Sequence, residues 1–132
     1  MNTYLLVINN GTISEEPCPP SGGNAGWSGK DQSPHDGFIF WVDYSEKDYL
    51  EMHQIYVRES DRQKGNGKKL MLALEDIARE KKVKYIYIAS TAVREQPFGA
   101  FLYDLKYERV HDPFYDHMII NDHVYHYRKC LK

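Results

Sequence analysis

The chain has 132 residues and a formal net charge of -2, from 17 basic and 19 acidic side chains. This length suits one domain with a single core, and 42% hydrophobic with 27% charged residues excludes wholesale disorder, collagen-like chains and disulfide scaffolds. The acidic balance argues against a nucleic-acid-binding module, and no apolar run approaches the roughly 18 residues that span a bilayer. Without a secretory signal at its start, the chain is predicted to be cytoplasmic, with no nucleic-acid or membrane partner.

The amino-terminal third is predicted to hold one strand and then a long loop. Residues 3–9 are apolar and rich in β-branched side chains, which favours a strand, and Asn10-Gly11 follows as a turn signal. The segment at about 10–37 contains most of the prolines and glycines, so it cannot sustain a regular helix. A loop of this length is either functional or disordered. If it is functional, four of its side chains could shape a substrate pocket: Trp27, Asp31, His35 and Asp36.

Two further strands are predicted before the most informative turn of the chain. Residues 38–42 form a near-continuous apolar run, typical of a buried strand. Residues 49–57 alternate along a second strand, so every second side chain from Glu51 to Val57, including His53, is expected on one face.

A glycine-containing turn, Arg62-Gln63-Lys64-Gly65-Asn66-Gly67, leads directly into a predicted helix. Gly65 and Gly67 carry no Cβ, so the backbone can adopt positive φ and approach a ligand closely. The free amides of the first helical turn, the helix dipole and the nearby lysines then predict an anionic phosphate site. The alternative is a plain glycine turn before a surface helix.

The predicted helix has an apolar stripe at helical spacing, which consists of Leu70, Met71, Leu74, Ile77 and Ala78. Glu75 and Arg79 are predicted to form an i,i+4 ion pair on its solvent side. Beyond it we expect a strand at 85–89, a short helix at 98–105 and closing strands at 118–120 and 124–131. The element order predicts a mixed α/β fold in one domain, residues 1–132. The carboxy-terminal histidines lack metal-ligand spacing, so no metal site is predicted.

The strand end followed by Arg62-x-x-Gly65-x-Gly67 resembles the acetyl-CoA-binding signature of the GNAT superfamily of N-acetyltransferases, Q/R-x-x-G-x-G/A. The resemblance extends from residue 38 to the end. It implies a largely antiparallel, twisted sheet flanked by helices, with the amino-terminal helices shortened or replaced by the loop. It also implies that backbone amides of residues 62–68, which include Lys68, hold the pyrophosphate of coenzyme A. The strand end Ile55-Tyr56-Val57 would pair with the pantetheine arm.

A second block is similar to the family pattern N-x-x-A-x-x-x-Y, with Gln96, Gly99 and Tyr103 at these spacings. The resemblance implies that Gln96 contacts the cofactor and that the Tyr103 hydroxyl protonates the departing thiolate. The alternative is that Tyr103 is a core or surface tyrosine, one of 11 in the chain.

The function implied is transfer of an acetyl group from acetyl-CoA to an amine, on a small molecule or a protein, directly in a ternary complex. A lysine-like amine has a pKa near 10.4, so a general base is needed at neutral pH. Glu51 lies six residues before Val57, at the place of the family's glutamate base, and His53 is the second candidate. The alternative for Glu51 is an ordinary polar residue on a half-exposed strand. The rival function is a catalytically inactive acyl-CoA-binding or protein-interaction domain on the same fold, and a homodimer is left open.

Overall fold

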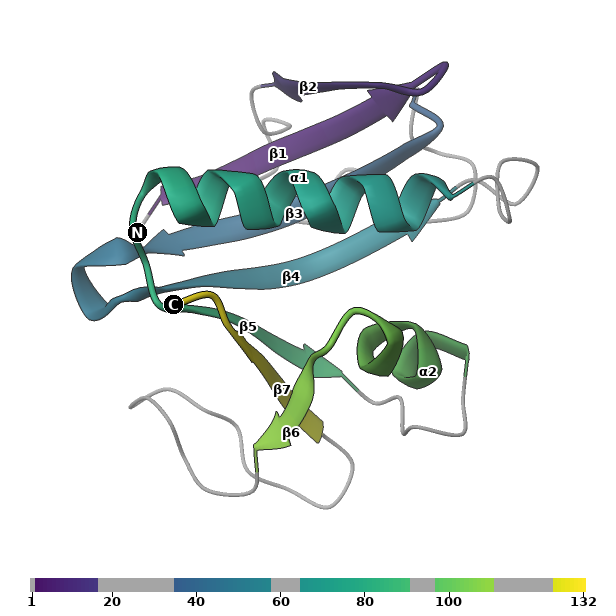
Figure 1. The fold of residues 1–132 in the computed structure, drawn as a ribbon. Helices are drawn as coiled ribbons and strands as arrows, with labels where there is room; N and C mark the ends of the chain where they lie inside the picture. The colour runs from purple at the N-terminus through teal and green to yellow at the C-terminus, as the bar shows by residue number, and fades with distance from the viewer. Residues whose placement is uncertain (1, 17–34, 58–64, 91–96, 111–124) are drawn as a thin grey trace.

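The structure, a computed structural model, describes residues 2–16, 35–57, 65–90, 97–110 and 125–132 (Figure 1). Its elements in chain order are β1 (Asn2–Asn9), β2 (Thr12–Glu16), β3 (Gly37–Tyr44), the 3-10 helix η1 (Ser45–Lys47), β4 (Tyr49–Val57), α1 (Asn66–Glu80), β5 (Tyr85–Ser90), α2 (Pro97–Asp104), β6 (Glu108–Val110) and β7 (Tyr125–Cys130).

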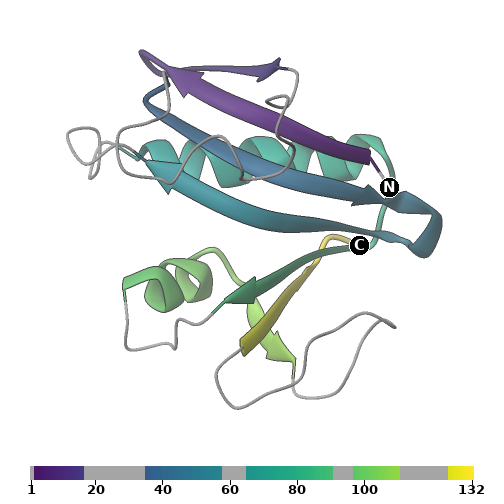
Figure 2. The ribbon, with the colours of Figure 1, turned by 180° about the vertical axis from the view of Figure 1, so that it is seen from behind.

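All described strands belong to one seven-stranded sheet, in the order β2-β1-β3-β4-β5-β7-β6. Neighbouring strands are antiparallel except β4 and β5, which are parallel. Helix α1 lies across one face of β1, β3 and β4 (Figure 1), and the view from behind shows it on the far side of these strands (Figure 2). The predicted mixed, largely antiparallel sheet with flanking helices is confirmed. Within the described ranges, no helix is both long and apolar enough to cross a membrane.

Most predicted elements are present, and their ends differ from the predicted ones by at most two residues. The strand predicted at 49–57 is β4, and the helix predicted at 98–105 is α2. The short strand β6 was not predicted, because three residues carry too little pattern. It pairs with β7. The strand predicted at 118–120 lies outside the described residues.

The loop predicted at about 10–37 is wrong for its first part, which contains strand β2. Asn10 and Gly11 have φ values of 51° and 80°, and this tight turn sends the chain back along β1. Strand β2 was not predicted because it lacks an apolar pattern. It is an edge strand whose side chains, apart from a partly buried Ile13, face solvent. Between β1 and β3 the described residues form this strand and no helix. Trp27 and Asp31 lie outside the described residues.

The end of this segment returns to the β1–β2 hairpin through polar contacts. Asn9 Nδ2 donates to Nδ1 of His35 over 2.9 Å, and Nε2 of His35 lies 3.1 Å from a Glu16 carboxylate oxygen. The Asp36 carboxylate accepts a 2.8 Å hydrogen bond from the backbone amide of Asn10. These contacts fix where the chain enters β3.

The main core lies between the sheet and α1. It contains Leu6, Ile8, Ile39, Trp41, Leu50 and Met52 from the strands and Leu70, Met71, Leu74 and Ala78 from the helix. The predicted apolar stripe of the helix is therefore confirmed, with Ile77 only partly buried. The prediction that Glu75 lies on the solvent side is wrong, because its side chain is 1% exposed. Its carboxylate faces Lys129 of β7 instead of water, a contact that helical periodicity alone does not reveal.

Gly37 is required where β3 begins, because three elements meet there. A Cβ at this position would lie 2.8 Å from the Tyr56 carbonyl oxygen, 3.2 Å from Ile8 Cγ2 and 3.3 Å from Leu70 Cδ1. We expect Gly37→Ala to lower the free energy of unfolding by about 1–3 kcal/mol, since backbone must move to admit the methyl group. Urea denaturation measures this, with Ser14→Ala on the exposed edge strand as the control, expected to change it by less than about 0.5 kcal/mol. An unchanged midpoint for Gly37→Ala would contradict this packing.

Candidate functional site

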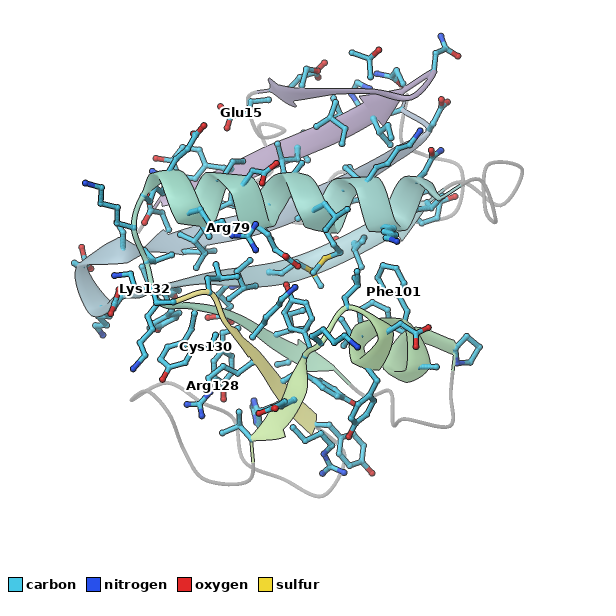
Figure 3. All side chains as sticks on the ribbon, in the orientation of Figure 1. Glu15, Arg79, Phe101, Arg128, Cys130 and Lys132 are labelled. Atoms are coloured by element: carbon cyan, nitrogen blue, oxygen red, sulfur yellow. The ribbon has the colours of Figure 1, made fainter. Side chains whose placement is uncertain are left out.

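A cavity of about 890 Å³ lies where the end of β4, the start of α1 and helix α2 meet. Figure 3 shows Phe101 rising from α2 toward the ends of β4 and α1. The lining residues are Ile55, Tyr56 and Val57 of β4, Gly65, Asn66, Gly67 and Lys68 at the start of α1, and Pro97, Phe98, Phe101, Asp104 and Leu105 of the α2 segment. Its volume is within the range of small-molecule sites. The structure thus brings together seven of the predicted cofactor-binding residues.

The start of α1 presents backbone amides to this cavity. Gly65 has φ +78°, the left-handed conformation that glycine adopts without strain, and this N-cap residue has no side chain with which to cap the helix. The first helical bond runs from Lys69 N to Gly65 O at 2.9 Å, so the amides of residues 66–68 precede the helical ladder. With the dipole and the Lys68 ammonium, these donors favour a negatively charged group. The predicted Arg62, Gln63 and Lys64 lie outside the described residues.

Gly67 has a different role from Gly65, because its φ is not positive. A Cβ at Gly67 would lie 3.5 Å from Phe101 Cζ and 3.7 Å from Val57 Cγ2. The absence of a side chain therefore keeps space open between α1, β4 and α2.

Helix α2 supplies an apolar wall that sequence reasoning did not assign to the site. Phe98 and Phe101 stack with ring centroids 6.0 Å apart, and with Leu105 they follow the three- and four-residue spacing of one helix face. This spacing of apolar residues is the sequence signal from which the wall could have been predicted. Tyr103 is not among the lining residues: its ring packs edge-to-face against Tyr127 of β7, with centroids 6.2 Å apart. Gln96 lies outside the described residues.

A β-bulge in β4 changes which side chains share a face. Trp41 of β3 pairs with Met52 and Phe40 pairs with Gln54, so His53 is the extra residue. The prediction that Glu51, His53, Ile55 and Val57 share one face is therefore wrong. Beyond the bulge, Ile55 and Val57 join Met52 on the α1 side, while Glu51 stays on the opposite side. Sequence alternation alone does not reveal an inserted residue.

The sheet opens between β4 and β5 directly after the bulge begins. Their parallel pairing runs from Tyr49–Tyr85 to Met52–Ile88, whereas β4 continues to Val57. Figure 1 shows the two strands diverging from this point toward α2 and the start of α1. Glu51 lies one residue before the last pair and His53 one residue after it, so the two flank the narrow end of the opening. The cavity includes residues 55–57 of the unpaired end of β4.

Residues 31–102 match the model of the acetyltransferase (GNAT) family. The chain belongs to this family. It is therefore an acyltransferase, and the family predicted from the glycine turn is confirmed. Among curated proteins, none matches the sequence.

Solved structures of other proteins share this GNAT fold. An acetyltransferase from Bacillus cereus is 20% identical, with a TM-score of 0.59 over 98% of this chain and 73% of that one. The PaiA N-acetyltransferase from Thermoplasma acidophilum, solved in complex with coenzyme A, is 18% identical, with a TM-score of 0.55 over 73% of this chain and 54% of that one. Tetrahymena GCN5 is 16% identical, with a TM-score of 0.59 over 78% and 64%. At these identities the likeness establishes the fold.

In this GNAT acyltransferase, Glu51 and His53 form a close pair on the sheet face opposite α1. Glu51 is 8% exposed, and its Oε1 lies 3.2 Å from Nε2 of His53. Burial raises the pKa of the Tyr44 phenol, and the negative charge of Glu51 raises it further. Burial likewise raises the pKa of Tyr87, where Arg128 opposes the shift and Glu51 adds to it. The Glu51 carboxylate therefore lies near two phenols that stay uncharged at neutral pH.

The carboxy-terminal histidines are described only in part. His126 of β7 is 7% exposed, and its ring centroid lies 6.0 Å from that of Tyr87. Among the residues with described positions, no group of three or more His, Cys, Asp or Glu could hold a metal ion. The other three, His111, His117 and His123, lie outside these residues.

Proposed function

We propose that this chain is an N-acetyltransferase that transfers an acetyl group from acetyl-CoA to an amine acceptor, directly in a ternary complex. The carrying observation is a cavity lined by the start of α1 and by residues 55–57 of β4, which lie beyond the last pair of β4 with β5. The acceptor is an amine on a small molecule or a protein. A cytoplasmic location and a single domain stay predictions, and a homodimer stays open.

The lining of the cavity matches the two parts of coenzyme A. The amides of residues 65–68 and the Lys68 ammonium suit its diphosphate. The apolar side chains of Val57, Phe98 and Phe101 suit its pantetheine arm, which would lie along the edge of β4 that runs past the last pair with β5. PaiA, a protein with this fold, was solved with coenzyme A, which supports the assignment.

The reaction needs proton transfers, and we assign these to Glu51 and its neighbours. When bound, acetyl-CoA supplies the acetyl group as an activated thioester. An arm lying in the opening would end at its narrow side, beside Glu51 and His53. Glu51 would accept the proton of the acceptor amine, with His53 as the second candidate. Backbone amides of the β4 end would donate to the thioester carbonyl. Tyr103 stays a prediction for the acid, and its packing against Tyr127 makes it the weakest of these assignments.

A coenzyme A thiol-release assay with a panel of amines, beside calorimetry with acetyl-CoA, tests the proposal. We expect acetyl-CoA to bind and thiol release to depend on at least one primary amine. Tight binding without amine-dependent turnover would favour the rival, an inactive acyl-CoA-binding domain. Absence of binding would overturn the proposed function.

A further inference from the structure

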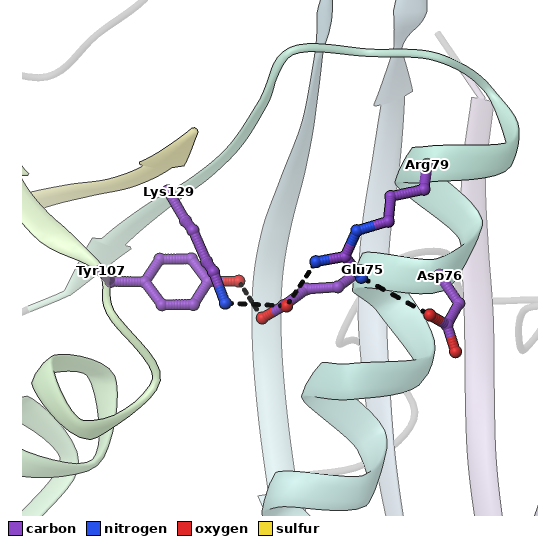
Figure 4. Close-up of polar contacts among 5 residues, drawn as sticks. All are labelled: Glu75, Asp76, Arg79, Tyr107 and Lys129. Atoms are coloured by element: carbon purple, nitrogen blue, oxygen red, sulfur yellow. Dashed lines mark hydrogen bonds and ion pairs between the residues drawn. The ribbon is translucent and has the colours of Figure 1, made fainter. Parts of the chain in front are cut away.

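A buried carboxylate on α1 joins three segments of the chain (Figure 4). Glu75 is 1% exposed, and its Oε2 accepts a 3.3 Å hydrogen bond from the Tyr107 hydroxyl. Its Oε1 lies 2.8 Å from Nζ of Lys129 on β7 and 3.5 Å from the Arg79 guanidinium. Helix α1, the third residue after the end of α2, and β7 are therefore connected through one side chain.

Packing alone does not explain a glutamate at this position. The other fully buried side chains along the middle of α1 are apolar, namely Leu70, Met71, Leu74 and Ala78. A buried charge is expensive to desolvate, and a buried ion pair is often no more stable than apolar residues of similar volume. Hydrogen bonds hold their partners at a preferred distance and angle, whereas contacts of an apolar side chain do not. The glutamate can therefore position its partners in a way that an apolar residue cannot. Burial raises the pKa of Tyr107, and the Glu75 charge raises it further, so the phenol keeps the proton that it donates.

The position of Tyr107 is coupled to that of α2. The Tyr107 amide donates to Leu102 O and the Lys106 amide to Tyr103 O, both at 2.9 Å, and Lys106 has φ +73°. This is the hydrogen-bond pattern of a Schellman C-cap, which makes the Tyr107 backbone part of the helix end. Tethering the Tyr107 ring to Glu75 therefore tethers α2.

Helix α2 forms one wall of the cavity, and the first residues of α1 form part of the facing wall. The two approach each other beside the cavity, where a Cβ on Gly67 would lie 3.5 Å from Phe101 Cζ. The second approach is Glu75 with Tyr107, about 12 Å further along α1 by helical rise. Two separated contacts restrict both the position and the angle of α2 relative to α1 more than either contact does alone.

We propose that Glu75, Tyr107 and Lys129 form a positioning network that holds the α2 wall at the spacing from α1 that the acyl-CoA arm requires. This rests on the proposed function for the identity of the ligand. The network does not touch the reacting atoms, so its loss weakens acyl-CoA binding and leaves the chemical step intact.

Two variants test the network. Tyr107→Phe removes only the hydroxyl, and the double variant Glu75→Leu with Lys129→Met removes both charges together, so that neither is left buried alone. For each we expect the dissociation constant of acetyl-CoA to rise about tenfold, the equivalent of one hydrogen bond to a charged group, with kcat changed by less than about twofold. Hydrogen exchange in peptides spanning 97–107 should become faster without ligand, while exchange in β1 and β3 stays unchanged.

Two controls separate positioning from general loss of stability. Asp76→Asn alters an exposed carboxylate on the same helix, 77% exposed, and should change neither readout. Val7→Ala, in the separate cluster on the opposite sheet face, should lower stability without weakening acetyl-CoA binding. Unchanged exchange and affinity in Tyr107→Phe, or an equal loss of affinity in Val7→Ala, would overturn the proposal. If the wild-type chain does not bind acetyl-CoA, the proposed function fails, and the exchange of α2 alone decides whether the network positions this helix.

Discussion

Gly67→Val is expected to weaken acetyl-CoA binding by at least about 100-fold, which corresponds to losing more than about 2.7 kcal/mol of binding free energy. The Cβ alone would already be in van der Waals contact with Phe101 and Val57. The two further methyl groups of valine must enter either these side chains or the cavity beside the amides of α1. Both choices remove space that the diphosphate and the arm would occupy. Isothermal titration calorimetry measures the change.

Gly67→Ala is the matched control. Its methyl group would lie 3.5 Å and 3.7 Å from its nearest neighbours, which is ordinary contact, so we expect binding within about fivefold of the wild type. Valine and alanine are both compatible with a helical φ, so neither variant should prevent folding, which thermal unfolding checks. Wild-type affinity in Gly67→Val would place the cofactor elsewhere on the molecule.

Glu51→Gln is expected to lower kcat by about 10²- to 10⁴-fold, the usual contribution of a general base, and to leave the dissociation constant of acetyl-CoA within about twofold. In the wild type, Glu51 Oε1 lies 3.2 Å from His53 Nε2. The glutamine side chain has the shape of glutamate and keeps an oxygen that can face His53. Its amide does not accept a proton from the amine, however. Steady-state rates with the best amine of the panel give kcat.

His53→Gln is the companion variant, since His53 is far more exposed than Glu51. We expect a smaller loss of kcat for it than for Glu51→Gln. The reverse order would transfer the role of base to His53. Full activity in Glu51→Gln, together with a lowered melting temperature, would leave Glu51 as a buried polar residue of the sheet.

The glycines that open α1, and the elements on either side of them, could be predicted from the sequence because their signals are local. A strand at 49–57, glycines at 65 and 67 and an apolar stripe from Leu70 onward each depend on the φ preference or the periodicity of neighbouring residues. Such preferences act within one element, so they can be read from the sequence without knowledge of the tertiary structure. The mixed sheet follows from the order of these elements together with the family resemblance.

The tertiary structure alone decided the features that depend on contacts between elements. The bulge at His53 arises from the register between β3 and β4, so it separates Glu51 from Ile55 although the alternation of the sequence is regular. Glu75 is buried because β7 and Tyr107 come to α1 from distant parts of the chain. The opening of the sheet likewise depends on where the pairing of β4 with β5 stops. Local patterns specify which face of an element is apolar, whereas partners from elsewhere in the chain determine what each polar side chain meets.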